Sequence, residues 1–470
     1  MTNIYRYFRF GPLNKKVIAI SVPALLTMVS HTVVMITDTA MVGRLNTEAI
    51  AATGLGGFFI LTIISLFFGL SIAVQIITAR RIGEKSFNQA KKILLISLFW
   101  VVFLSIIISV PGWFFSKNIA LLFVTEGAIP ELVSDYIRFR LLGLIFYAVI
   151  LMYRGFFDGL GMTYVGMAAA FISTASNVLL NWILIYGNLG FPAYGVKGAA
   201  IASSLAAIPG LLIFFIFLKT SRYRQMASLA KNTGKNPPKN PALTLTILRA
   251  KFQTFKVVTK ELISIGLPTA SQELLLHVAF LFFYKIAANI GAISMASANI
   301  LISIMSLSFM PGMAFGIAAT TILGQAMGAA KLNLARIATH RAALFAAIVM
   351  GSLGILFIVF GKTALKVFTH EKLVIADAYP GLVIVSLIQV GDALHMVYAS
   401  ALRGAGMVNK VFLYYLIASY LIMLPLAYLF GVILNMQSDG LWISVSIWIV
   451  FLGINFLRIF NKGEWRSYKV

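Results

Sequence analysis

Three carboxylates, Asp38, Glu273 and Asp392, fall inside long apolar stretches of this sequence. A charge at the centre of a bilayer costs roughly 2.5–3.5 kcal/mol on insertion scales, so such side chains normally face a bundle interior or an aqueous cavity. There they can bind a coupling cation or a proton and attract a cationic substrate. The alternative roles are a structural ion pair or a side chain that reaches the membrane surface. The sequence favours ion binding, more for Asp38 and Asp392 than for Glu273.

Two amides share one face of the fifth apolar stretch. Asn177 and Asn181 are four residues apart, which places them on the same side of a helix. Their amide oxygens suit Na⁺ as hard ligands, and they can also hydrogen bond to a carboxylate. Hydrogen bonds between membrane helices are the alternative explanation. Ser203, in the next stretch, is a weaker candidate of the same kind.

Prolines and histidines inside these stretches have less certain roles. Pro23 and Pro268 each interrupt a helical span and remove one backbone hydrogen bond. Each proline is a candidate hinge, and a static kink is an equal alternative. His31, His277 and His395 also lie in spans. A proton relay is possible for them, but single helical histidines are more often packed and hydrogen-bonded.

Several chemistries lack their residues. The chain has no cysteine, so Cys-type zinc sites and thiol nucleophiles are excluded. It also lacks a phosphate-binding P-loop, and no nucleophile–base constellation or metal-ligand cluster falls in the spans. The sequence therefore predicts a protein that is not an enzyme, needs no cofactor and draws on an ion gradient of Na⁺ or H⁺.

The elements that position these residues are membrane helices. Of the 470 residues, 60% are hydrophobic and 11% charged, against about 25% charged in a soluble domain. The apolar runs are continuous rather than alternating, which excludes a β-barrel. We expect an all-α membrane protein with twelve spans. Their approximate ranges are 17–42, 54–79, 93–115, 134–157, 163–187, 195–218, 258–287, 296–326, 341–360, 378–402, 410–434 and 440–460.

The basic residues predict the orientation. The net charge of +24 would suggest nucleic acid in a soluble protein. Here the basic residues gather in alternate loops, which is typical of cytoplasmic loops and places both termini in the cytoplasm. We therefore expect no nucleic-acid partner, and contact with anionic membrane lipids instead. The predicted location is the cytoplasmic (inner) membrane of a bacterium or archaeon.

The two halves of the chain resemble each other. Pro23 and Pro268 are 245 residues apart, and the same offset relates Gly83 to Gly328, Asn88 to Asn333 and Ala90 to Ala335. Six spans per repeat is an even number, so the repeats should be parallel and related by a pseudo-two-fold axis along the membrane normal. The predicted division is an N-lobe at 1–218, a basic cytoplasmic linker at 219–256 and a C-lobe at 257–470.

These residues together resemble the multidrug and toxic compound extrusion (MATE) family over nearly the whole chain. Span one resembles the family's D-x-x-x-x-G stretch between Asp38 and Gly43. The later spans add the Arg154-Gly155 and Asp158-Gly159-Leu160-Gly161 motifs, and span ten carries Gln389-x-x-Asp392 followed by Leu402-Arg403-Gly404.

The resemblance implies a secondary antiporter that exports organic cations and amphipathic drugs in exchange for Na⁺ or H⁺ by alternating access. It implies an N-lobe ion site at Asp38, Asn177 and Asn181, able to hold Na⁺, and a C-lobe site near Asp392, with Gln389 beside it and Glu273 as a further acid. Some relatives have a second acid where Asn181 stands. The expected partners are small-molecule substrates and lipids, and the expected state is a monomer. A lipid-linked oligosaccharide or lipid flippase of the same superfamily is the alternative.

Overall fold

The computed structural model describes residues 11–124, 127–220 and 243–468, and their regular secondary structure is entirely helical. The first half contains α2 (Pro12–Val42), α3 (Thr47–Gly83), α4 (Phe87–Phe114), α5 (Ser116–Leu121), α6 (Ile129–Leu160), α7 (Thr163–Tyr186), η1 (Asn188–Gly190), α8 (Val196–Leu205) and α9 (Ala207–Leu218). The second contains α11 (Leu243–Ile290), α12 (Ala292–Gly328), α13 (Leu332–Phe368), α14 (Lys372–Leu387), α15 (Gln389–Gly404), α16 (Val408–Ile417), η2 (Ala418–Met423), α17 (Leu424–Tyr428), η3 (Leu429–Ile433), α18 (Gln437–Lys462) and η4 (Glu464–Ser467).

Each predicted span coincides with a helix or with consecutive helices. Among the described residues, eleven helical segments are long and apolar enough to cross a membrane, and twelve if one bent pair counts as a span. That pair is α14 and α15, which meet at an angle of 55°. The predicted all-α membrane fold is therefore confirmed, but the span expected at 378–402 is broken rather than continuous.

The described residues form two compact units, and two helices contribute to both. The N-unit is Leu26–Ala270, and the C-unit is Met1–Leu25 together with Ser271–Val470. The boundaries fall two residues after Pro23 in α2 and two after Pro268 in α11. Each helix therefore passes from one unit to the other beside its proline. These packing units differ from the predicted division into an N-lobe at 1–218 and a C-lobe at 257–470. The first part of α2 packs in the C-unit, and the first part of α11 packs in the N-unit.

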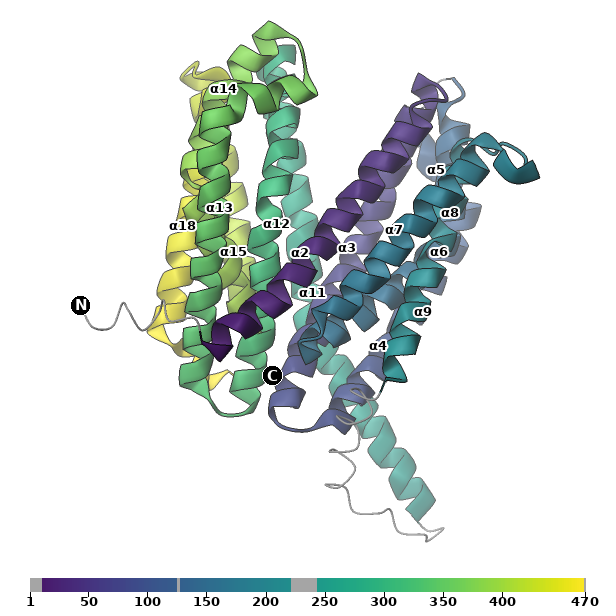
Figure 1. Ribbon diagram of the computed structural model, residues 1–470, viewed down its shortest axis with the longest axis vertical. Coiled ribbons are helices and arrows are strands. Elements are labelled where there is room, and N and C mark those ends of the chain that lie inside the picture. Colours follow the sequence, from purple (N-terminus) through teal and green to yellow (C-terminus); the bar gives the residue numbers. More distant parts are fainter. Residues whose placement is uncertain (1–10, 125–126, 221–242, 469–470) are drawn as a thin grey trace. The chain divides into compact units, whose positions relative to one another are not determined.

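The N-unit is held together by close helix packing. Helix α6 lies against α3, α4 and α8, and α7 lies against α8 and α9 (Figure 1). The first part of α11 joins the unit through Trp100 of α4, whose Nε1 donates to Thr259 Oγ1 at 2.8 Å, and through Arg81 of α3, which pairs with Glu261 at 2.8 Å. From Leu243 onward the predicted linker is helical, and neither proline nor glycine follows Pro241 until Gly266. Residues 221–242 lie outside the described residues.

The C-unit is built around α12, α13, α15 and α18, which pack side by side (Figure 1). Its large apolar core includes Val17 and Ile20 from the first part of α2. The same part of α2 is fixed by polar contacts, since Lys16 Nζ donates to Gln325 Oε1 at 2.9 Å. Helix α2 is therefore anchored in the C-unit before it enters the N-unit.

The Arg-Gly pairs noted in the sequence mark close helix crossings in both units. A Cβ atom on Gly155 would lie 2.3 Å from Ser71 O, and one on Gly404 would lie 3.0 Å from Thr320 Cα. Hydroxyl groups bridge both crossings: Ser71 donates to Leu151 O at 2.6 Å and Thr320 donates to Ser400 O at 2.8 Å. In both cases the accepting carbonyl lies three residues before the arginine, so the two repeats share this packing.

Candidate ion sites

Asp38 belongs to a closed ring of hydrogen bonds in the N-unit. Asn181 Nδ2 donates to Asp38 Oδ1 at 2.5 Å and to Asn177 Oδ1 at 3.2 Å. Asn177 Nδ2 donates to Ser203 Oγ at 3.2 Å, and Ser203 Oγ donates to Asp38 Oδ2 at 3.4 Å. The two asparagines are fully buried and Asp38 is half-buried. The structure thus brings together four residues that the sequence singled out on three different helices.

Packing fixes the helices that carry this ring. The last residue of α2, Val42, belongs to a small apolar cluster with residues of α3, α6, α7 and α8. Two hydrogen bonds tie α2 to α7: Tyr186 Oη donates to Met41 O at 2.7 Å, and the hydroxyls of Ser30 and Thr174 are 2.6 Å apart. Asp38 and Asn181 are therefore held in register by contacts on both sides of them.

A cation that the sequence did not predict lies near this site. Arg140 of α6 is within electrostatic range of Asp38, and it also hydrogen bonds to the buried Tyr136. An arginine inside a span is itself a signal of function, so this partner could have been sought from the sequence. Its charge partly balances that of Asp38 when no cation is bound there.

The donor set of the ring suits a hard cation. Its members supply a carboxylate, two amide oxygens and a hydroxyl, and carboxylate and carbonyl oxygens favour hard ions. Asn181 Oδ1 is buried and accepts no hydrogen bond from the described residues. A buried acceptor without a donor is costly, and Na⁺ held between Asn181, Asn177 and Asp38 would satisfy it.

Asp392 occupies a different environment in the C-unit. It lies in the first turn of α15, directly after the break from α14, where the positive end of the helix dipole favours a carboxylate. Its side chain is fully buried, and Oδ1 is 3.0 Å from Nδ1 of His395. Asp392 Oδ2 accepts no hydrogen bond among the described residues. The nearest polar partner is thus an imidazole rather than another oxygen ligand, which suits a proton better than Na⁺.

The other predicted C-lobe residues make polar contacts of their own. Gln389 is buried one turn earlier, where its Oε1 accepts a hydrogen bond from Ser308 Oγ at 2.5 Å. Glu273 is partly exposed and lies 3.9 Å from Arg403. Neither side chain shows a hydrogen bond to Asp392. Glu273 therefore has a cationic partner, which is the ion-pair role that the sequence left open for it.

The prolines and the remaining histidines are placed as follows. Pro23 and Pro268 lie inside continuous helices at the boundaries of the two units. His31 packs edge-on against Tyr147, with ring centroids 6.5 Å apart. Nδ1 of His277 lies 2.7 Å from Glu273 O. No group of three or more His, Cys, Asp or Glu that could hold a metal occurs in the described part of the chain.

Comparison with known families gives a match to both halves. The family model MatE matches residues 23–183 and 268–429. Each matched segment begins at one of the two prolines, and their starts are 245 residues apart (268 minus 23). This offset equals the one that relates the glycines, asparagines and alanines of the two repeats. The family model covers more than half of the chain.

Curated relatives match over almost their full length. The "Probable multidrug resistance protein NorM" of Thermotoga maritima is 24% identical over 460 residues, which is 97% of this chain and 94% of the relative. The "Multidrug resistance protein NorM" of Photobacterium profundum is 28% identical over 442 residues, covering 92% of this chain and 91% of the relative.

Solved structures share the fold. A transporter of the MOP superfamily from Pyrococcus furiosus, whose binding pocket is described as having reversed polarity and suggesting a different function, aligns with a TM-score of 0.83 at 21% identity over 98% of both chains. An outward-facing multidrug resistance MATE transporter aligns with a TM-score of 0.83 at 22% identity over 96% of both chains.

Proposed function

Since the chain belongs to the MatE family, and is an integral membrane protein related to multidrug efflux transporters, we propose that it is a secondary antiporter. It exports organic cations and amphipathic drugs across the cytoplasmic membrane in exchange for Na⁺ or H⁺, by alternating access and as a monomer. The observation that carries this proposal is the pair of embedded carboxylates, Asp38 and Asp392. Two buried oxygens at these sites accept no hydrogen bond among the described residues: Oδ1 of Asn181, beside Asp38, and Oδ2 of Asp392 itself.

The two carboxylates supply the coupling. A ligand shifts a conformational equilibrium only by its different affinities for the two states. Cation or proton binding neutralises a carboxylate and favours one state, whereas a cationic substrate competes for the same charge and favours the other. The names of the relatives, which refer to multidrug resistance, support drugs as the substrate class.

The proposal is tested with purified protein in proteoliposomes. Ethidium transport is measured under an imposed Na⁺ gradient and then under an imposed pH gradient. We expect at least one gradient to drive transport, and Asp38→Asn and Asp392→Asn each to reduce it strongly. Asp377→Asn is the control, because Asp377 accepts a hydrogen bond from Ser438 and lies outside both sites.

Two results would refute the proposal. One is wild-type transport by both site variants, which would remove the carboxylates from the mechanism. The other is an absence of ethidium transport under both gradients together with gradient-independent movement of a fluorescent lipid between leaflets. That second result would identify a flippase.

A further inference from the structure

His395 connects Asp392 to a second titratable side chain. Its Nδ1 is 3.0 Å from Asp392 Oδ1, and its Nε2 is 2.7 Å from the hydroxyl of Tyr415 on α16. The side chain is buried, and it lies between the rings of Trp448 and Phe456 on α18, at centroid distances of 5.6 and 6.2 Å. These aromatic walls restrict the rotation of the ring, so both hydrogen bonds persist together.

Chemistry assigns the direction of these hydrogen bonds. An ionised carboxylate only accepts hydrogen bonds, so Nδ1 of a neutral His395 must carry the proton that it donates to Asp392. Nε2 is then the acceptor, and the Tyr415 hydroxyl donates to it. The three side chains form one ordered chain of donors that ends at Asp392.

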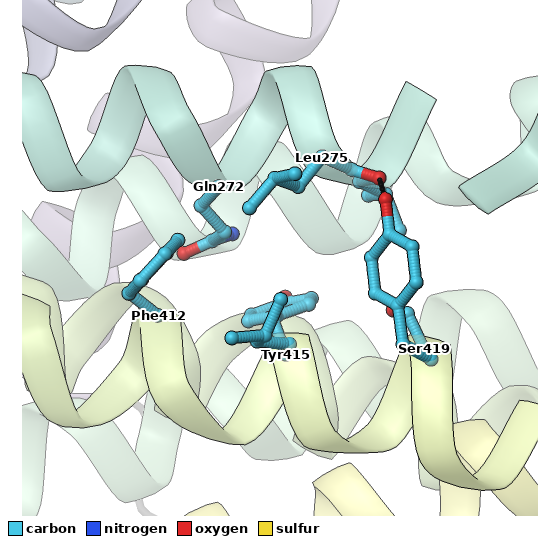
Figure 2. A pocket seen from close by; sticks show the side chains of 8 residues that line it. Gln272, Leu275, Phe412, Tyr415 and Ser419 are labelled. Atoms are coloured by element: carbon cyan, nitrogen blue, oxygen red, sulfur yellow. Dashed lines mark hydrogen bonds between the residues drawn. The ribbon is translucent and has the colours of Figure 1, made fainter. Parts of the chain in front are cut away.

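The far end of this chain reaches a small cavity. Tyr415 lines it together with Gln272 of α11 and with Ser419 and Tyr420 of the π-helical segment η2. Figure 2 shows the Gln272 amide pointing from α11 into the space beside Tyr415. The cavity has a volume of about 10 Å³, which is close to the least that holds one water molecule. Its lining is mostly apolar, and the polar groups of Gln272, Ser419 and Tyr420 are the ones able to hold that water beside the tyrosine.

Part of the cavity wall is a segment of π-helix. Segments of π-helix are rare and often occur at functional sites. Within η2, Tyr420 donates to Leu275 O of α11 at 2.8 Å, and Ser419 accepts from Trp448 Nε1 at 3.2 Å. A shift of this segment would therefore alter both the cavity and the ring that packs against His395.

Few other charges face this chain of side chains. The charged groups within electrostatic range of the Tyr415 hydroxyl are Arg403, Glu273 and Asp392. Helix α18 packs the aromatic rings of Trp448 and Phe456 against His395, and the histidine of α13, His340, contacts the hydroxyl of Tyr398 instead. Asp392 is thus the carboxylate that His395 contacts directly.

We propose that Tyr415 and His395 form a proton relay that loads and unloads Asp392 from the cavity between α11 and η2, and so make the C-unit site selective for protons. This inference rests on the proposed function, because it specifies the ion of one of its two sites. It assigns roles to two residues, His395 and Tyr415, that do not themselves bind substrate.

The relay conserves every proton. An excess proton that reaches the cavity water as hydronium passes to the Tyr415 oxygen and leaves a neutral water, while the tyrosine gives its own proton to His395 Nε2. His395 Nδ1 then gives its proton to Asp392 Oδ1, so tyrosine ends neutral, histidine ends as the Nε2–H tautomer and Asp392 ends neutral. Unloading reverses each transfer along the same path, which restores the first tautomer without rotation of the ring.

The experiment follows protonation directly. Infrared difference spectroscopy after a pH jump on the full-length protein records the C=O band of a protonated carboxylic acid, which Asp392→Asn assigns. We expect the band to appear at least about tenfold more slowly in His395→Gln and Tyr415→Phe, since a positioned proton-transfer group typically contributes about 10²–10⁴-fold. His277→Gln and Tyr414→Phe are matched controls that should keep the wild-type rate.

A transport assay distinguishes failure of the proton relay from failure of the proposed antiport function. In proteoliposomes, His395→Gln should lower ethidium transport driven by a pH gradient and shift its pH profile, while transport driven by Na⁺ persists. Wild-type rates of Asp392 protonation in both variants would overturn the relay even if the protein is an antiporter. Slowed protonation without any ethidium transport in the wild type would support the relay and refute the proposed function instead.

Discussion

The substitution Asn181→Asp is the sharpest test of the N-unit site. Asn181 Nδ2 donates at 2.5 Å to Asp38 Oδ1 and at 3.2 Å to Asn177 Oδ1. A carboxylate has no N–H group, so both hydrogen bonds are lost, and a protonated carboxyl, with its single O–H, can restore only one of them. The variant also places a second acid where some relatives of the MATE family have one.

Repulsion between the two carboxylates sets the size of the effect. Two unit negative charges 2.5 Å apart repel each other by about 7 kcal/mol at an effective dielectric constant of about 20. At about 1.4 kcal/mol for each factor of ten, the doubly ionised pair is disfavoured by about 10⁵-fold. The pair therefore holds one proton at neutral pH, and this proton restores the short hydrogen bond to Asp38.

That proton must leave before Na⁺ can use both carboxylates. We expect the Na⁺ concentration for half-maximal ethidium transport to rise as the pH falls, by up to about tenfold per pH unit, which is the limit for one proton exchanged for one Na⁺. The wild type should show a weaker dependence. Asn188→Asp is the control, because Asn188 lies in η1, outside the site, and donates to Trp182 O. The half-maximal Na⁺ concentration could instead vary with pH no more steeply in Asn181→Asp than in the wild type. That result would refute the idea that the two carboxylates share a proton.

Two further predictions concern packing. Gly155→Ala should lower the thermal unfolding midpoint in detergent, because the new Cβ would lie 2.3 Å from the backbone oxygen of Ser71 and overpacking typically costs about 1–3 kcal/mol. Gly57→Ala is the control: its Cβ meets nothing within 4 Å, and alanine favours the helix interior, so the midpoint should not fall. Trp465→Ala should destabilise the C-unit by about 3–5 kcal/mol, because Trp465 is fully buried and donates to Phe460 O at 2.8 Å; an unfolding midpoint equal to that of the wild type would contradict this estimate.

The helical architecture was predictable because lipid imposes it. Twelve long apolar runs need no tertiary information to be recognised as spans, since backbone polar groups in a bilayer must be satisfied within the helix. The break in the tenth span was not predictable in the same way, because Ile388, where it occurs, is neither proline nor glycine. Both α14 and α15 pack against α12, α13 and α18, and these tertiary contacts leave no signal in the local sequence at the break.

The candidate sites were predictable in part. The spacing of Asn177 and Asn181 placed them on one face, and the structure adds Ser203 and Asp38 to the same ring. Arg140 lies inside a span, which is itself a signal of function, but only the fold brings it near Asp38. His395 was judged an ordinary packed histidine, since only the fold brings Tyr415 against its second nitrogen.

The two repeats share a scaffold, but their ion sites are not copies of each other. In the first span of each repeat the offset is 245, so Asp38 corresponds to Phe283, which is fully buried against Trp442. In the fourth span the offset given by the Arg-Gly pairs is 249, so Asp392 corresponds to Gly143, where a Cβ would lie 2.3 Å from Ser204 Cβ.

Neither equivalent position suits a carboxylate. Phe283 is buried against Trp442, where an ionised side chain would be desolvated among apolar neighbours, and Gly143 leaves no space for a Cβ atom. Each site therefore depends on a helix that carries no acid at the matching place in the other repeat, and the donors differ accordingly: oxygen ligands around Asp38, and an imidazole and a phenol beside Asp392. We expect chemically different sites to bind different ions. The duplication thus explains the shared packing of the two units, whereas coupling has to be explained for each carboxylate from its own neighbours.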